Sequence, residues 1–283
     1  MQFWTRLLLQ RHNSGRRLGQ GMARLLALPL AAVLVLGWGA ASARACGVSA
    51  GGGIIRASFA AGTPDAVRLT FVGHATFLLE TPQGVRAATD YNGVVLPDGV
   101  PDLITMNHAH MTHYTDRPDP RIAHVLRGWR EDGAPARIDM RVGDLRVWNL
   151  PTSTRGWGEG EKTYGNSVFV FESAGLCIAH LSHLHHVLTE DDLAVLGPID
   201  VVLAPVDGVW TLDLAGMAEV LDRLHPRLVI PMHYYGNSVL ERFLAQERDR
   251  YAVRRAGDVT TILSRATLPD TPQILVLEAQ QRY

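Results

Sequence analysis

At 283 residues, with 47% hydrophobic and 19% charged residues, the chain has an ordinary globular composition and enough apolar side chains for a large core. Its formal charge of -1 hides an asymmetry, because the first 45 residues carry six arginines and no acidic residue. The remainder holds 21 basic and 28 acidic residues, a formal -7, so the composition gives no electrostatic reason to expect a nucleic-acid partner.

Residues 1–45 are predicted to be a signal peptide. They combine an arginine-bearing leader, an apolar stretch at residues 25–38 and a small-residue cleavage site, Ala43-Arg44-Ala45. The apolar stretch is about 14 residues long, too short for a stable membrane span of about 20. Sec-type export is favoured, and Arg16-Arg17 leaves a twin-arginine signal open. We therefore expect an exported protein, periplasmic or extracellular.

The chain contains two cysteines, Cys46 and Cys177. Cys46 would be the first mature residue, but Arg44 disrupts the sequence that lipid attachment needs, so no lipid anchor is expected there. An exported chain could join the two cysteines, yet the apolar run around Cys177 favours a buried free thiol. Residues 46–64 are rich in small residues and predict a flexible tether before a domain at 65–283.

The first half of this domain is predicted to consist of short strands, because apolar or alternating runs lie between turn residues. The predicted strands are residues 67–72, 76–81, 84–89, 103–106, 122–126, 136–142, 145–150, 167–172 and 176–180. Residues 152–165 are polar and glycine-rich around Trp157, and they predict an irregular loop at a pocket mouth.

The second half is predicted to alternate helices with strands. Thr189 and three following acidic residues predict a capped helix at 190–196. Further helices are predicted at residues 214–224 and 239–248, and further strands at 201–205, 228–231, 260–263 and 273–278. A domain that begins with consecutive strands and continues with alternating helices and strands indicates two sheets packed face to face with helices outside.

Three histidines follow the predicted strand 103–106 within the stretch Asn-His-Ala-His-Met-Thr-His, residues 107–113. On an extended chain His108 and His110 project to the same side, and His113 returns from the next turn. Imidazole is a common zinc ligand, so this spacing predicts a metal site. A second histidine group surrounds His183, and His233 follows a third strand-like run.

Five segments carry a resemblance to a known family. They are Gly73 to Glu80, Thr89-Asp90, the 107–113 stretch, the region around His183, and Ile230 to Tyr234. In this order they resemble the metallo-β-lactamase superfamily, nearest its ascorbate-6-phosphate-lactonase-like branch, over about residues 66–265. The resemblance implies an α/β fold, a four-layer αββα sandwich with a metal site at one edge.

The sequence departs from the family pattern at three expected ligands. Thr112 replaces an aspartate, Thr152-Ser153-Thr154 follows Pro151 where a histidine is usual, and Ser182-His183 stands where a glycine and a metal-bridging aspartate are usual. A site without the bridging carboxylate is expected to hold one divalent metal ion, zinc first, with iron or copper left open. The expected ligands are His108, His110, His183 and His233, with His113 as a fifth ligand or an outer group.

Two carboxylates are candidate catalytic bases. The resemblance places Asp90 at the edge of the site, where the alternative is that it only accepts hydrogen bonds from His110 or nearby backbone. Asp207 follows the predicted strand 201–205. It is expected either to compensate for a lost carboxylate or only to cap the turn before Thr211.

The remaining candidates have outer roles. His74 and His180 are expected to orient ligands, and at most one of the adjacent His185 and His186 faces the site. The residues expected at a substrate mouth, with ordinary loop packing as the alternative, are Arg155, Trp157, Tyr164 and Asn166.

Together these features predict an exported metal-dependent hydrolase that uses metal-bound water on a small-molecule ester, lactone or phosphodiester. Two alternatives stay open: a non-catalytic metal-binding or ligand-binding protein on the same scaffold, and an imidazole-rich redox site. The sequence does not indicate an oligomeric state.

Overall fold

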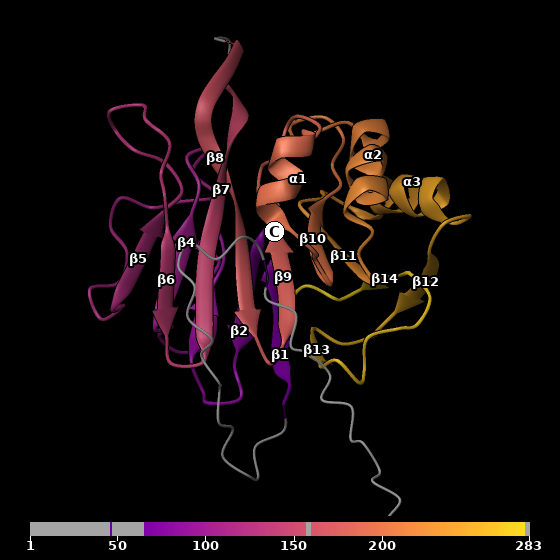
Figure 1. The fold of residues 1–283 in the computed structure, drawn as a ribbon, viewed down its shortest axis with the longest axis horizontal. Helices are drawn as coiled ribbons and strands as arrows, with labels where there is room; N and C mark the ends of the chain where they lie inside the picture. The colour runs from indigo at the N-terminus through magenta and orange to yellow at the C-terminus, as the bar shows by residue number, and fades with distance from the viewer. Residues whose placement is uncertain (1–45, 47–64, 157–159, 281–283) are drawn as a thin grey trace, which may run out of the picture. The chain divides into compact units, whose positions relative to one another are not determined.

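The computed structural model describes Cys46, residues 65–156 and residues 160–280. The predicted signal peptide and all of the predicted tether except Cys46 lie outside these described residues. The domain consists of two β-sheets packed face to face, with helices on one outer side (Figure 1). The predicted α/β fold of two facing sheets is therefore confirmed, whereas the fourth layer, helices outside the six-stranded sheet, is not seen among the described residues.

One sheet has six strands in the order β13-β1-β2-β3-β4-β5. Its strands are β1 (Val67–Gly73), β2 (Thr76–Glu80), β3 (Arg86–Ala88), β4 (Leu103–Met106), β5 (His124–Arg127) and β13 (Thr260–Leu263). Loops cover its outer face, because Ile104 and Met106 of β4 pack against Tyr91, Ile122 and Trp129. Among the described residues no helix lies in this outer layer.

The second sheet has eight strands in the order β12-β14-β11-β10-β9-β8-β7-β6. Its strands are β6 (Asp139–Val142), β7 (Leu145–Gly156), β8 (Gly160–Ser173), β9 (Leu176–His180), β10 (Val201–Pro205), β11 (Leu228–Met232), β12 (Ala252–Arg255) and β14 (Gln273–Val276). Strands β9, β10 and β11 run parallel, and every residue in them is buried. Such continuous apolar runs are typical of strands covered on both faces.

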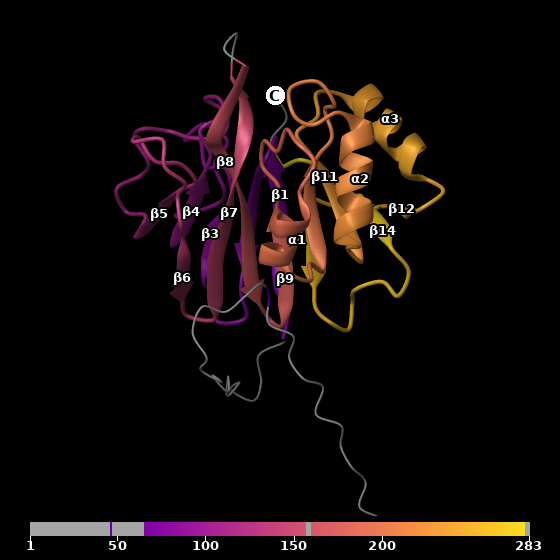
Figure 2. The ribbon, with the colours of Figure 1, turned by 45° about the horizontal axis from the view of Figure 1, so that its top comes forward.

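Three helices follow the parallel strands: α1 (Glu190–Leu196), α2 (Leu214–Leu224) and α3 (Asn237–Glu247). Met217 of α2 and Phe243 of α3 pack onto the outer face of the eight-stranded sheet. Between the two sheets, Phe77, Phe169 and Ile230 belong to a separate core. Figure 2 shows α1 beside β9, and α2 and α3 on the side of the molecule where β11, β12 and β14 lie.

The prediction of an irregular loop at 152–165 was wrong, because most of these residues extend the β7–β8 hairpin. Thr154 pairs with Lys162 and Arg155 pairs with Glu161, so β7 and β8 continue beyond the rest of the sheet (Figures 1 and 2). The first five residues of β8 are exposed, so no apolar face marks the strand in the sequence. Strand β12 is exposed along its whole length, so it also lacks an apolar face and was not predicted from the sequence. Trp157 lies outside the described residues.

The prediction of a free thiol at Cys177 was also wrong. Cys46 and Cys177 form a disulfide with their Cα atoms 5.7 Å apart, and both residues are buried. The apolar surroundings of Cys177 indicated burial, but the position of its partner 131 residues earlier has no local signal. A sulfur in a disulfide has no thiol to accept a lipid. Within the described residues, no helix has the length and apolar character needed to span a membrane.

Replacing both cysteines with serine is expected to lower the free energy of unfolding by about 2–4 kcal/mol, because the disulfide restricts the unfolded chain. Urea denaturation of the double variant and the wild type measures this difference. The urea midpoint of the wild type treated with reductant should approach that of the variant. An unchanged urea midpoint in the variant would contradict the prediction.

Candidate metal centre

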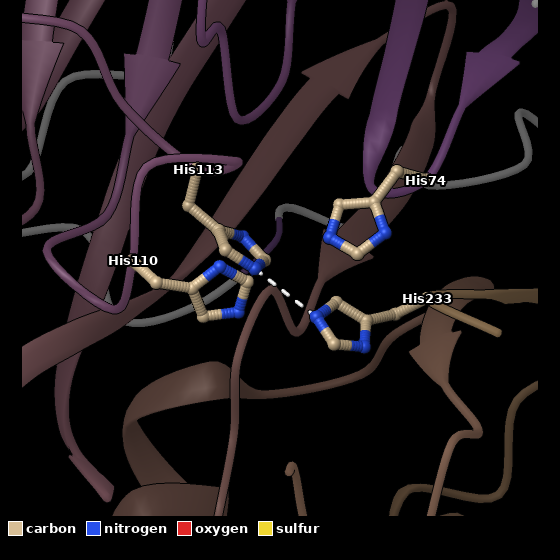
Figure 3. A group of neighbouring side chains, drawn as sticks. All are labelled: His74, His110, His113 and His233. Atoms are coloured by element: carbon tan, nitrogen blue, oxygen red, sulfur yellow. Dashed lines mark hydrogen bonds between the residues drawn. The ribbon is translucent and has the colours of Figure 1, made fainter. Parts of the chain in front are cut away.

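Four histidines converge at one edge of the sandwich. His74, His110, His113 and His233 each offer a ring nitrogen, and these four atoms lie within 4.8 Å of one another (Figure 3). His74 lies in the turn between β1 and β2, His110 and His113 follow β4, and His233 follows β11. Both sheets therefore contribute to the cluster.

The backbone is strained around these histidines. Seven non-glycine residues of the described chain have positive φ, and four of them are His74, Asp90, Ser182 and His233. Such left-handed conformations are uncommon for non-glycine residues and cost about 1–3 kcal/mol each where the surroundings hold them. The His233 N–H donates to the His74 carbonyl at 2.8 Å and ties two of these positions together. Strain concentrated in one place indicates a functional site.

Two of the imidazoles face each other through their Nε2 atoms. His113 Nδ1 lies 2.6 Å from Asp90 Oδ2, and His233 Nδ1 lies 3.3 Å from Asp207 Oδ1. A carboxylate beside each Nδ1 favours the tautomer with its proton there. The two Nε2 atoms lie 3.1 Å apart, a contact that Figure 3 marks as a hydrogen bond, and with Nδ1 protonated on both rings they would direct lone pairs toward each other. Two nitrogens about 2.0–2.1 Å from one zinc ion also lie roughly 3 Å apart, so this pair fits a shared metal.

Burial favours the neutral form of three of these imidazoles. Together with the nearby His233, it lowers the pKa of His74 to about 2 and that of His110 to about 4. Burial also lowers the pKa of fully buried His113 well below its ordinary value. Neutral imidazole is the form that binds metal, so these three side chains are ready to bind a cation at neutral pH.

The metal-free protein is expected to lose stability as the pH falls below about 6.5. Burial lowers the pKa of His180 and of His183 to about 3, from an ordinary value of 6.5, so the unfolded chain binds more protons between these values than the folded protein. The free energy of unfolding therefore falls on acidification, by up to about 1.4 kcal/mol per pH unit for each fully buried imidazole.

Urea denaturation of chelator-treated protein at several pH values measures this slope. The His183→Gln variant should show a shallower dependence, because one buried imidazole is gone. A wild-type stability that does not change between neutral pH and about pH 5 would contradict the prediction.

Asp90 is positioned to hold His113. Its carboxyl group is fully buried and accepts hydrogen bonds from Ser182 Oγ at 2.6 Å and Asn107 Nδ2 at 3.0 Å, besides its contact with His113 Nδ1. Burial raises the pKa of Asp90, and the hydrogen bonds from Ser182 and Asn107 oppose this rise because they favour the ionised carboxylate. The geometry matches the hydrogen-bonding alternative for Asp90, with His113 rather than His110 as the partner.

Asp207 caps a turn and faces His233. Its Oδ2 accepts the N–H of Val209 at 3.1 Å and of Trp210 at 2.5 Å, and the Thr211 hydroxyl donates to Oδ1. Burial alone would raise the pKa of Asp207, but His233 beside it and the hydrogen bond from Thr211 hold it below its ordinary value. The geometry matches the capping alternative for Asp207, and the capped turn aims its carboxylate at His233.

A fifth imidazole lies beside the cluster. The ring of His183 is centred 5.0 Å from that of His110 and 5.2 Å from those of His113 and His233. Its Nδ1 is 3.1 Å from Thr154 Oγ1, whereas its Nε2 is buried without a hydrogen-bond partner. An orphaned buried nitrogen at this place fits a role as a metal ligand.

Hydroxyl groups stand at the positions where the family pattern led us to expect other ligands. Thr112 Oγ1 lies 2.8 Å from His74 Nε2 and 2.8 Å from His110 Nδ1. Thr154 contacts His183, and Ser182 donates to Asp90. These hydroxyls hold imidazoles and a carboxylate in place, and none of them adds negative charge to the cluster.

The structure does not bring His108 into the cluster. Its ring stacks on Trp129, with centroids 5.0 Å apart, and its Nδ1 contacts Lys162 Nζ. Strand β4 ends at Met106 and residues 108–110 form a bend, so the alternation of an extended chain does not apply to them. The His108 N–H donates to the Gly165 carbonyl at 3.0 Å, which fixes this bend against the β7–β8 hairpin.

His74 takes the place that His108 was expected to fill. We expected His74 to orient ligands, yet it offers a nitrogen to the cluster from 36 positions before His110. Its sequence signals are the Gly73-His74 turn between two predicted strands and the family resemblance carried by residues 73–80. His180 has an outer position, with Nε2 2.9 Å from the Ala75 carbonyl, and His186 Nε2 accepts the Ser153 N–H at 3.3 Å.

The predicted mouth residues separate into two groups. Arg155 donates to the Val209 carbonyl at 3.2 Å, and Tyr164 is partly exposed. Asn166 is buried and donates to Thr152 Oγ1 at 2.8 Å, so it packs inside the hairpin. The structure therefore places Arg155 at the surface beside the turn that Asp207 caps.

The two-sheet sandwich with an imidazole cluster at its edge defines a metallo-β-lactamase fold. Residues 68–233 match the family model described as a beta-lactamase superfamily domain, and the chain belongs to this superfamily. It is similar to a UPF0173 metal-dependent hydrolase from Opitutus terrae, 28% identical over 234 residues that cover 70% of this chain and 97% of the relative.

Two further comparisons agree with this family. A UPF0173 metal-dependent hydrolase from Pyrococcus furiosus is 27% identical over 196 residues, covering 59% of this chain and 84% of the relative. A solved structure from Thermotoga maritima, assigned as a Zn-dependent hydrolase of the metallo-β-lactamase superfamily, superposes with a TM-score of 0.54 at 25% identity. That alignment covers 75% of this chain and the whole of the other.

Proposed function

We propose that the protein is an exported metal-dependent hydrolase that cleaves an ester, lactone or phosphodiester bond in a small molecule. One observation carries the proposal: imidazoles converge with the Nε2 atoms of His113 and His233 facing each other 3.1 Å apart. The metal-dependent hydrolases among the similar proteins support the reaction class.

The metal ligands in this proposal are His74, His110, His113 and His233, with His183 as a fifth. The set is neutral and rich in nitrogen, which suits zinc and leaves iron or copper as alternatives. One ion is favoured, because the cluster has no carboxylate between its imidazoles to hold two dications together. A divalent metal here would act as a Lewis acid and make water nucleophilic at neutral pH.

The chain's own carboxylates position the imidazoles in this proposal. Asp90 holds the proton of His113 on Nδ1, and Asp207 does the same for His233, so that both Nε2 atoms stay available. The oxygens of both carboxylates are already engaged by hydrogen bonds, which supports orientation rather than proton transfer as their role.

The disulfide supports the export part of the proposal. Disulfides persist in oxidising compartments and are rare in the cytosol. The Cys46–Cys177 bond begins at the position that the predicted signal cleavage would make the mature N-terminus. Oxidised Cys46 in protein recovered from a periplasmic or secreted fraction is the result that we expect.

Elemental analysis combined with turnover tests the whole proposal. The purified protein is assayed with p-nitrophenyl esters, simple lactones and bis-p-nitrophenyl phosphate, before and after treatment with a chelator. About one equivalent of zinc and turnover that a chelator removes and zinc restores would support the proposal. Iron or copper with a visible spectrum would favour the redox alternative, and bound metal without turnover would favour a non-catalytic protein.

A further inference from the structure

Exposed apolar side chains gather on the loops that surround the metal centre. The described chain has ten large exposed apolar side chains. Five of them lie on these loops, and we call these five the apolar rim: Val94, Met111, Val209, Trp210 and Tyr235. Single exposed apolar residues are normal on proteins, but a group of them at one place marks a binding site.

Two rim residues are joined directly to cluster residues. Met111 lies between His110 and Thr112 in the chain and is 80% exposed. Tyr235 is 52% exposed, and its ring is centred 5.4 Å from that of His74 and 6.1 Å from that of His233. These two exposed side chains therefore lie next to cluster residues.

The other rim residues are held in place by groups of the site. The N–H groups of Val209 and Trp210 donate to Asp207, which faces His233. Val94 is fixed by Asn92, which accepts the Val94 N–H at 2.8 Å and donates to the Thr112 carbonyl at 2.9 Å. The structure thus fixes exposed apolar side chains around the cluster, although water would favour their burial.

We propose that the substrate carries a large apolar group next to its hydrolysable bond, and that the apolar rim binds this group. The inference rests on the proposed function for the reacting end of the substrate. Its occupant is a medium-length acyl chain, because the rim offers aliphatic, thioether and aromatic surfaces on which such a chain can lie. Arg155 donates a hydrogen bond to the Val209 carbonyl, which helps to hold this rim residue in place.

A series of acyl hydroxamates tests the rim without requiring turnover. The hydroxamate group binds metal, so acetohydroxamate, butyrohydroxamate and octanohydroxamate present the same head group with longer chains. Calorimetric titration of the zinc-loaded protein should show affinity rising about two- to fourfold for each added methylene group, the upper figure corresponding to full burial. The Trp210→Ser and Tyr235→Ser variants should lower the ratio of octanohydroxamate to acetohydroxamate affinity at least fivefold.

The Val253→Ser variant is the matched control, because Val253 is a similarly exposed apolar residue on β12. It should keep the wild-type ratio. Affinity that does not rise with chain length, or a wild-type ratio in both rim variants, would overturn the inference. If the protein turned over none of the ester, lactone or phosphodiester substrates but still showed the chain-length effect, the proposed function would be wrong. The inference that the rim binds an apolar group would still hold.

A second measurement does not depend on bound metal. The metal-free protein is mixed with the apolar dye 1-anilinonaphthalene-8-sulfonate, and its fluorescence enhancement is recorded. The rim variants should lose most of this enhancement while Val253→Ser retains it. Equal enhancement in all of these proteins would overturn the inference even if no metal can be loaded.

Discussion

The His233→Ala variant is expected to lose bound metal and at least about 10³-fold in hydrolytic rate. The substitution removes the Nε2 atom that faces His113 at 3.1 Å and leaves buried Asp207 without its imidazole partner. A catalytic metal stabilises the transition state by several kcal/mol, and each 1.36 kcal/mol corresponds to tenfold in rate, so its loss has an effect of this size.

Metal content per protein and turnover measured on the same sample test this expectation. The His124→Ala variant is the control, because His124 is a partly exposed histidine of β5 outside the cluster. It should retain wild-type metal and activity. If His233→Ala kept its metal, the convergence of imidazoles seen in the structure would not be the metal site.

The Asp90→Asn variant is expected to bind metal about 10- to 100-fold more weakly, because the hydrogen bond that orients His113 is lost. Asparagine keeps the size of the side chain and tolerates the positive φ of 41° at this position, so the change isolates the carboxylate. Its amide would direct N–H groups at Ser182 or Asn107, which are themselves donors to Asp90. We therefore expect a further stability loss of about 1–3 kcal/mol.

Competition with a chromogenic chelator measures the metal affinity of this variant, and urea denaturation of the metal-free protein measures its stability. The control is Asp144→Asn, since Asp144 accepts hydrogen bonds from Thr81 and Gln83 and has no contact with the cluster. Wild-type metal affinity in Asp90→Asn would show that His113 is oriented without the carboxylate.

The elements with strong local signals follow from the sequence alone. The predicted helices 190–196 and 214–224 are confirmed at both ends. Thr189 and Asp213 cap their first turns, and α2 ends at His225 in a left-handed conformation before Pro226. The strands 103–106, 176–180 and 201–205 are also confirmed, because buried strands read as short apolar runs between turn residues.

What the sequence determined is therefore the fold, the order of its elements and the presence of a histidine-rich site. Only the tertiary structure decided which imidazoles meet: His74 joins the cluster while His108 turns away to Trp129. The spacing of residues in the sequence predicts the direction of their side chains only where the backbone is regular. At the cluster the backbone bends and adopts positive φ. The Cys46–Cys177 bond was hidden for a related reason, because contacts between distant segments depend on how the sheets pack.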